Sequence, residues 1–309
     1  PEFINLKVLE SRSSDISNIV NIKKMPTIKD LLSHTAGFSY NFMNDAVGRE
    51  YDRIKLFHSD TTTLTEEINL LATLPLLYQP SDEWVYSVSV DVMARIIEVT
   101  TNTSLQLELK KRIFDPLEMS DTSFTVESKN HDRLMTHYEF DPLNKKLHDP
   151  LISSQKISGF GYPLNQLTYA RGGHGLFSTL EDYSKFAQML LDGKSIKGKS
   201  IISKSMLSLA STNHLDLKFL PLEIKTFDVE VLEENGLEGY GWGLGFRVLT
   251  DLNKTKGIGG IGEFGWSGAA ATYFLVDPKN DLTAVLMTQV FGADNILQKD
   301  FVSEIYKNL

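Results

Sequence analysis

The hydrophobic pattern of the chain changes near residue 240. Before that point, apolar residues recur at helical spacing behind capping residues, as after Thr63 with Glu66 and after Thr179 with Asp182. Beyond it, short runs rich in β-branched and aromatic residues alternate with turn residues. A mostly helical stretch followed by consecutive short strands predicts an α+β fold, in which an antiparallel sheet is flanked by helices.

The caps and apolar spacings also predict where individual elements lie. Helices are expected to begin at Thr27, Thr63, Ser89, Ser104 and Thr179 and near Asn295. The first of them should end at Gly37. Strands are expected at 242–249, 271–276 and 282–288, and the turn residues at 277–281 should join the last two as a hairpin.

The length suits one large globular domain or two modest ones, and the composition is that of a globular protein. The chain has 309 residues, of which 41% are hydrophobic and 23% charged. We expect residues 1–309 to form a single domain that is incomplete at its N-terminus. It should comprise a mainly helical and loop region at 27–240, followed by C-terminal antiparallel strands and a final helix at 241–309.

The charge pattern argues against a nucleic-acid or membrane partner. The 40 acidic and 31 basic residues give a net charge of −9, and the basic residues are scattered apart from short clusters such as 110–112. Nucleic-acid binding requires clustered Lys and Arg. No window approaches the roughly 18 apolar residues of a membrane helix. We therefore expect a soluble protein; its compartment is left open, with the cytoplasm preferred.

The sequence favours neither a metal nor an organic cofactor. There is no cysteine, which excludes disulfides, thiol nucleophiles and cysteine-ligated metals. The seven histidines form no His-x-x-x-His or His-Glu-x-x-His array.

Five short stretches, spread over nearly the whole chain, resemble motifs of one enzyme family. They are the "HTAG" segment at 27–38, a Trp-Val-Tyr-Ser segment at 80–91, "DPLEMSDT" at 115–122, "GGHGLFST" at 172–179, and "GEFGWSG" at 262–268. In this order they resemble the serine beta-lactamase and penicillin-binding-protein family, and within it the esterase branch of family VIII carboxylesterases. The resemblance implies a beta-lactamase/transpeptidase-like fold.

The resemblance also implies a three-part active site. The family combines a Ser-x-x-Lys motif, a Tyr-x-Asn or Ser-x-Asn motif, and a Lys-Thr-Gly-like triad on a sheet edge. Serine is a weak nucleophile at neutral pH and must pass its proton to a base. A lysine near a tyrosine favours the phenolate, which can act as that base. A backbone N–H on the strand then stabilises the oxyanion.

Tyr86 matches the second motif and is our candidate catalytic base. The alternative is a structural tyrosine with a satisfied hydroxyl, which would be the commoner case without the matching surroundings. Position 88 is Val rather than the Asn of beta-lactamases, and this difference favours ester hydrolysis.

The third motif is matched by Trp266, Ser267 and Gly268, which we expect to bind substrate together with the oxyanion-binding N–H of Ala269. The alternative is an edge-strand tryptophan beside a bulge. Trp266 replaces the lysine that would pair with a penicillin carboxylate, so uncharged esters are expected to be preferred.

Two histidines lie inside the matching stretches. His174 occupies a position that is usually glycine in the family, and we interpret it as filling a turn rather than facing the pocket. His34 is tempting as a general base, but a histidine at a helix end is commonly a cap or dipole partner, so we assign it no catalytic role.

The first motif has no counterpart at the expected place. Residues 1–26 contain no Ser-x-x-Lys, and the one literal match, Ser153 to Lys156, lies in a Pro- and Gly-flanked loop out of the family's order. Pro1-Glu2-Phe3 resembles the residues that follow the nucleophile helix in relatives. We expect that segment to lie outside this chain, and its absence to expose apolar surface that either the segment or self-association covers.

These observations predict a serine carboxylesterase that acts on small acyl esters through an acyl-serine intermediate. A non-catalytic homologue or inert fragment is the alternative, and a beta-lactamase or D-amino-acid peptidase is disfavoured by Val88 and Trp266. A site built on Ser153 and Lys156 would require both to lie near Tyr86. The least family-like regions, 141–166 and 215–239, are expected to line the pocket.

Overall fold

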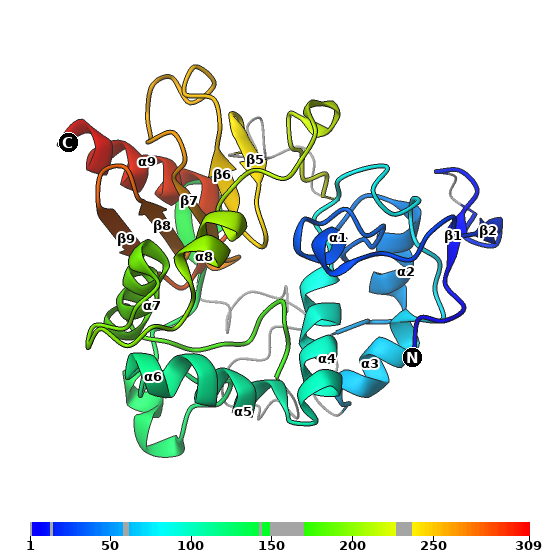
Figure 1. Cartoon of the computed structure of the whole chain (residues 1–309), viewed down its shortest axis with the longest axis horizontal. Coiled ribbons are helices and arrows are strands. Elements are labelled where there is room, and N and C mark those ends of the chain that lie inside the picture. The colour runs from blue at the N-terminus through cyan, green and yellow to red at the C-terminus, as the bar shows by residue number, and fades with distance from the viewer. Residues whose placement is uncertain (1, 13–14, 58–61, 142–143, 149–169, 227–236) are drawn as a thin grey trace.

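The computed structural model describes residues 2–12, 15–57, 62–141, 144–148, 170–226 and 237–309. The chain forms a mainly helical part and a sheet part that lie side by side (Figure 1). The helical part contains β1 (Lys7–Leu9), β2 (Ile19–Asn21), α1 (Ile28–Leu32), α2 (Ala46–Arg53), α3 (Leu64–Leu71) and α4 (Ser89–Thr101). From α4 the chain continues through α5 (Leu105–Leu109), the π-helix η1 (Lys110–Phe114), α6 (Asp115–Leu117) and the 3-10 helix η2 (Ser128–Arg133).

The remaining elements belong to the second half of the chain. They are β3 (Tyr138–Asp141), β4 (Lys146–His148), α7 (Leu180–Asp192), α8 (Lys204–Ala210), the 3-10 helix η3 (Leu217–Phe219), β5 (Tyr240–Trp242), β6 (Arg247–Leu249), β7 (Phe264–Ser267), β8 (Tyr273–Asp277), β9 (Leu282–Leu286), β10 (Val290–Phe291) and α9 (Asp294–Lys307). Strands β5 to β9 pair in sequence order as an antiparallel sheet. A second sheet has the order β10-β3-β4.

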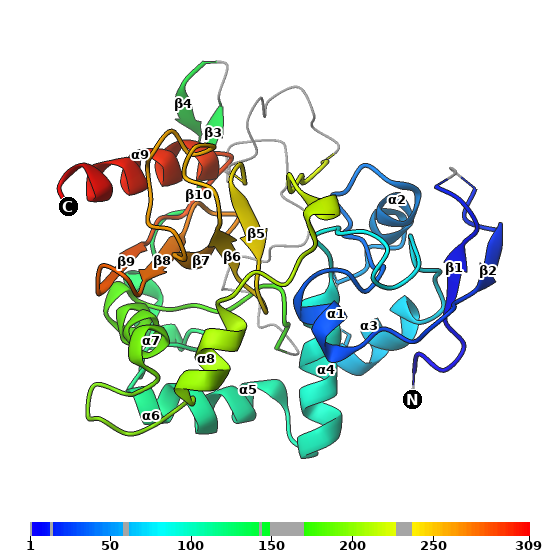
Figure 2. The same ribbon diagram turned by 45° about the horizontal axis from the view of Figure 1, so that its top comes forward.

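The large sheet is covered on both faces (Figure 2). Side chains alternate along a strand, so Phe274 and Val276 of β8 pack with α7 residues such as Ala187. Tyr273 and Leu275 point the other way and pack against Val302 of α9.

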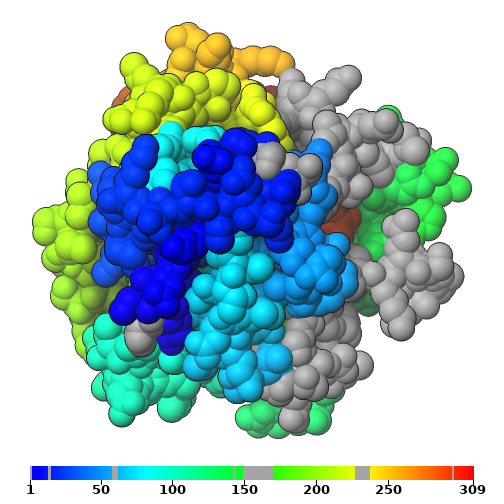
Figure 3. All heavy atoms as spheres, turned by 90° about the vertical axis from the view of Figure 1, so that its right-hand side faces the viewer, coloured from blue at the N-terminus to red at the C-terminus, as the bar shows by residue number. Residues whose placement is uncertain are grey.

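The helical part has its own apolar core. It includes residues with almost no exposure from each of its helices and from β1. Seen from this side, the surface is formed largely by the early, blue and cyan part of the chain (Figure 3). No helix in the described ranges is both long and apolar enough to cross a bilayer.

Most of the expected helix starts are confirmed. Thr27 and Thr63 both form capping boxes, and Ser104 and Thr179 accept hydrogen bonds from the first turns of their helices. The predicted helix end at Gly37 is wrong, because α1 ends at Leu32 and His34 already has a left-handed backbone, with φ of 56°.

The strand predictions hold except in one place. The hairpin between β8 and β9 is confirmed, with Asp277 opposite Leu282. The run at 242–249 is not one strand. It divides into β5 and β6 because Gly243 turns the chain, donating its N–H to the Phe246 carbonyl at 2.7 Å.

Candidate active site

Tyr86 lies in an aromatic cage just before α4. Its ring centroid is 4.7 Å from that of His34, 5.8 Å from Tyr40, 6.1 Å from Trp242 and 5.2 Å from Trp266. Backbone hydrogen bonds of the flanking residues, from Val85 to His34 and from Val88 to Ser39, hold this segment against the end of α1. The cage therefore fixes the ring on several sides.

The phenol of Tyr86 points to the sheet. The indole Nε1 of Trp266, on β7, donates to the Tyr86 hydroxyl at 3.2 Å, although the two residues are 180 positions apart in the sequence. Burial raises the pKa of Tyr86, the hydrogen bond from Trp266 lowers it, and the charge of Asp91 raises it. The net pKa is above the ordinary value, so Tyr86 is a neutral phenol at neutral pH in this chain.

The turn between β7 and β8 presents backbone groups beside Trp266. Gly268 donates to the Thr272 carbonyl at 2.8 Å, and a methyl group at Gly268 would overlap the Thr272 hydroxyl. Ala271 closes the turn with φ of 60°. Ala269 is exposed, and its N–H donates to no residue in the described part of the chain. The predicted oxyanion donor is therefore open to a ligand.

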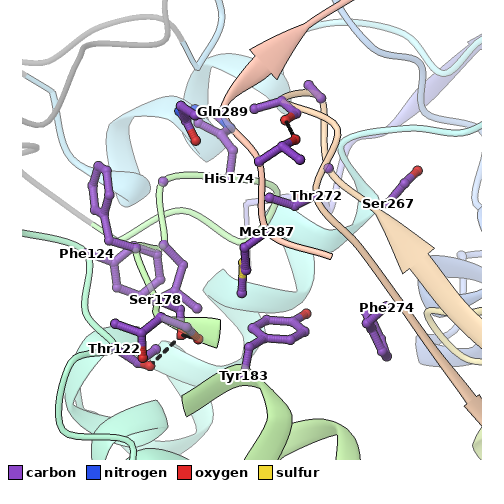
Figure 4. A pocket seen from close by; sticks show the side chains of 18 of the residues that line it. Thr122, Phe124, His174, Ser178, Tyr183, Ser267, Thr272, Phe274, Met287 and Gln289 are labelled. Carbon is purple, nitrogen blue, oxygen red and sulfur yellow. Dashed lines mark hydrogen bonds between the residues drawn. The ribbon is translucent and has the colours of Figure 1, made fainter. Parts of the chain in front are cut away.

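One large cavity brings the predicted residues together. Tyr86, Trp266, Ser267, Gly268 and Ala269 all line a cavity of 1650 Å³. Its lining includes the apolar or aromatic side chains of Phe124, Tyr183, Phe274 and Met287 (Figure 4). Small-molecule sites commonly measure about 300–1,000 Å³, so this cavity is larger than a single small ester needs. Of the predicted pocket-lining region 215–239, Ile224, Thr226 and Leu237 line it.

Comparisons with known proteins agree with this geometry. The family model described as Beta-lactamase matches residues 20–307. The chain belongs to the beta-lactamase family. A lovastatin esterase of Penicillium rubens is 30% identical, with 99% of this chain and 76% of that protein covered. An uncharacterized protein of Mycobacterium tuberculosis is also 30% identical, over 94% of this chain and 68% of its own length.

Solved structures confirm the beta-lactamase/transpeptidase-like fold. A simvastatin synthase from Aspergillus terreus matches all of this chain and 74% of its own, with a TM-score of 0.76 at 20% identity. EstCE1, a hydrolase with promiscuous acyltransferase activity, matches 91% of this chain and 72% of its own, with a TM-score of 0.71 at 22% identity. The chain is accordingly a hydrolase of the beta-lactamase family, and its curated relatives include esterases.

The two histidines of the family motifs occupy different environments. His34 is 1% exposed and accepts from the Ser87 N–H at 3.2 Å, and burial lowers its pKa to about 3. His34 is therefore a neutral ring that packs against the ring of Tyr86. His174 lines the cavity, contrary to our expectation of a simple turn filler, and its Nε2 accepts from the Arg171 guanidinium at 2.7 Å.

Asp91, to which we assigned no role from the sequence, is a buried carboxylate that contacts the cavity-lining residue Gly173. Asp91 has no exposure, and its Oδ1 accepts from the N–H groups of Gly172 and Gly173, each at 3.0 Å. Burial raises its pKa to about 6. Asp91 lies in the matched stretch 80–91 and the two glycines in the stretch 172–179, and neither stretch indicates that these residues meet.

Two other predictions concern the alternative serine site and a metal site. Ser153 and Lys156 lie outside the described residues. In the described part of the chain, no group of His, Asp and Glu side chains is arranged to hold a metal ion.

Proposed function

We propose that the chain is the larger part of a serine carboxylesterase that hydrolyses small, uncharged acyl esters. The observation that carries this proposal is the hydrogen bond from Trp266 to the Tyr86 phenol, in the same cavity as the open N–H of Ala269. A base and an oxyanion donor facing one space are what an acyl transfer requires.

The reaction would run through an acyl-serine. The serine Oγ attacks the ester carbonyl carbon while Tyr86, as phenolate, takes the serine proton, and the Ala269 N–H donates to the oxyanion. Collapse of the intermediate breaks the bond to the alcohol oxygen, which takes the proton from Tyr86. Water then repeats the sequence on the acyl-serine and releases the acid.

Tyr86 needs a cation to work as a base. Because burial and the nearby Asp91 raise its pKa, a positive group must approach the phenol to favour the phenolate. We infer that the lysine of a Ser-x-x-Lys motif supplies this charge, on a polypeptide segment outside residues 1–309.

The size and lining of the cavity support the proposal that this segment binds there. At 1650 Å³ it exceeds an ordinary ligand site, and its lining includes Phe124, Tyr183, Phe274 and Met287. An amphipathic helix would fill part of this cavity, leaving the space near Trp266 and Ala269 for substrate.

Two features support an esterase over a beta-lactamase. The side chain of Val88 is buried in the apolar core of the helical part, so position 88 offers the cavity no amide. Trp266 stands where a cation would pair with a penicillin carboxylate. The relatives named lovastatin esterase and esterase EstB agree with this choice.

The test is an intact-mass measurement, then hydrolysis of p-nitrophenyl butyrate and labelling with a fluorophosphonate probe. We expect the probe on a serine outside residues 1–309, in a polypeptide heavier than the 34.8 kDa of this chain. Tyr86→Phe should abolish labelling, whereas Tyr138→Phe, an exposed tyrosine on β3, should not. Labelling of Ser153 would favour the site at 153–156. The proposal would be contradicted if a polypeptide that carries Ser-x-x-Lys were neither labelled by the probe nor able to hydrolyse the ester.

A further inference from the structure

Asp91 joins two distant segments of the helical part. It lies in the first turn of α4, and its Oδ1 accepts from Gly172 and Gly173, which follow it by 81 and 82 residues. A carboxylate that accepts two backbone N–H groups at 3.0 Å holds that backbone firmly. Asp91 therefore fixes the position of the turn at 171–174.

That turn is part of the cavity wall. Arg171, Gly173 and His174 line the cavity with Tyr86, and Arg171 is only 2% exposed. The donation from Arg171 Nη1 to His174 Nε2 places the His174 proton on Nδ1. The turn thus presents a defined set of polar groups to the cavity.

The contact between turn and helix has no spare room. A methyl group at Gly173 would lie 2.5 Å from the Tyr40 hydroxyl and 2.8 Å from Asp91 Oδ2, and one at Gly172 would overlap the Val90 carbonyl oxygen. Tyr40 in turn stacks on Tyr86, with ring planes 17° apart. A displacement of the turn would therefore reach the Tyr86 ring through Tyr40.

The carboxylate also acts on Tyr86 through its charge. Asp91 Oδ2 is buried and has no hydrogen-bond partner among the described residues, so its charge is incompletely neutralised. The ionisable groups that interact with it are Arg171 from the turn, Glu67 from α3 and the buried phenols of Tyr40 and Tyr86. Around Tyr86 the facing groups are Tyr40, neutral His34 and the indole of Trp266.

We propose that Asp91 is the positioning residue of this site. It fixes the turn at 171–174 and, through Tyr40, the plane of Tyr86, and its charge adds to burial in opposing ionisation of the phenol until a cation enters the cavity. Only the entry of a cation into the cavity rests on the proposed function.

The charge effect can be measured on the chain without any catalysis. Tyrosinate formation is followed by ultraviolet difference titration in the wild type, Tyr86→Phe, Asp91→Asn and the Asp91→Asn/Tyr86→Phe double variant. Subtracting the Tyr86→Phe curve from the wild-type curve, and the double-variant curve from the Asp91→Asn curve, isolates the titration of Tyr86 with and without the Asp91 charge. Asp91→Asn keeps an oxygen for both glycine N–H groups and removes the charge, so the Tyr86 midpoint should fall by about 1 pH unit.

The matched control is Asp182→Asn. Asp182 is a buried carboxylate in α7 that likewise accepts a backbone N–H, from Asp121 at 2.8 Å, and it makes no contact with Tyr86. The Asp182→Asn variant should therefore leave the midpoint of the Tyr86 titration unchanged. An unchanged midpoint in Asp91→Asn, or an equal shift in Asp182→Asn, would overturn the role of the charge.

The positioning effect is read from the indole N–H resonance of Trp266, assigned with Trp266→Phe. Asp91→Ala, which frees the turn, should move this resonance further than Asp91→Asn, which removes only the charge. If Asp91→Ala fails to fold, the wild type still gives a test, because the Trp266 resonance should titrate with a midpoint near pH 6. A resonance that neither variant nor pH moves would overturn the proposal, whatever the esterase assay shows.

Discussion

Trp266 contributes to the site through its indole N–H as well as through its ring. The donation to Tyr86 at 3.2 Å orients the phenol and partly offsets the effect of burial on its pKa. A phenylalanine in its place would keep an aromatic neighbour but lose the donor.

We expect Trp266→Phe to lower the rate of acylation about two- to tenfold, since one neutral hydrogen bond contributes about 0.5–1.5 kcal/mol. The measurement is the rate of fluorophosphonate labelling of the complete hydrolase. Trp84→Phe is a suitable control, because Trp84 is also buried in the aromatic cluster but makes no hydrogen bond to Tyr86. Equal rates in Trp266→Phe and wild type would mean that the indole N–H has no catalytic effect.

The raised pKa of Asp91 has a consequence for stability. The folded pKa of about 6 lies above the ordinary 3.8, so the folded state binds this proton more tightly than the unfolded state. Ionised Asp91 therefore destabilises the fold above pH 6, and this cost disappears as the pH falls toward 4.

We predict that Asp91→Asn raises the free energy of unfolding by about 2 kcal/mol at pH 8. The gain should shrink on acidification and vanish near pH 4, as measured by urea unfolding of both proteins at several pH values. A gain that does not depend on pH would show that desolvation of the charge is not its cause.

At the scale of elements, α7 shows how a local signal fixes a helix. Thr179 accepts from the Asp182 N–H at 3.2 Å, and Gly193 ends the helix in a left-handed conformation. Both were predictable from the sequence because capping depends only on neighbouring residues.

Replacing this cap gives a clean stability test. Thr179→Ala should reduce the free energy of unfolding by about 1 kcal/mol, because a first-turn N–H loses its acceptor. Gln188→Ala, at an exposed position of the same helix, should change it by less than about 0.5 kcal/mol. Urea unfolding measures both, and equal losses would mean that the cap does not stabilise α7.

Elements that depend on distant partners were not predictable. The two-stranded sheet β1–β2 and the pairing of β3 with β10 involve very short strands, whose sequences carry little periodicity. The early end of α1 depends on the left-handed backbone of His34. The same limit applies to the site: Tyr86 and Trp266 match residues of the family motifs, whereas Asp91 and Gly172 lie in two motifs 81 residues apart, and neither motif indicates that they meet.

At the scale of the whole molecule, the large cavity has a consequence for association. Its apolar wall includes Phe274 and Val285 on neighbouring strands of the sheet. A cavity of this size and character is unfavourable when exposed to water.

We expect residues 1–309, produced alone, to self-associate and to bind an apolar dye, because no other polypeptide would cover this wall. Sedimentation velocity over a range of concentrations and dye fluorescence measure the two effects. Val285→Lys should weaken both, and Val99→Lys, an exposed valine on α4, should weaken neither. A chain that stays monomeric and binds no dye at any concentration would contradict the expected covering of the cavity.

The hydrogen bond between Tyr86 and Trp266 crosses from the helical part to the sheet part. A hydrogen bond at 3.2 Å is lost when its atoms separate by about 1 Å more. The two halves of the molecule can therefore retain all their helices and strands while the base has already lost its partner. In dilute denaturant, ester hydrolysis should fail before circular dichroism detects any melting.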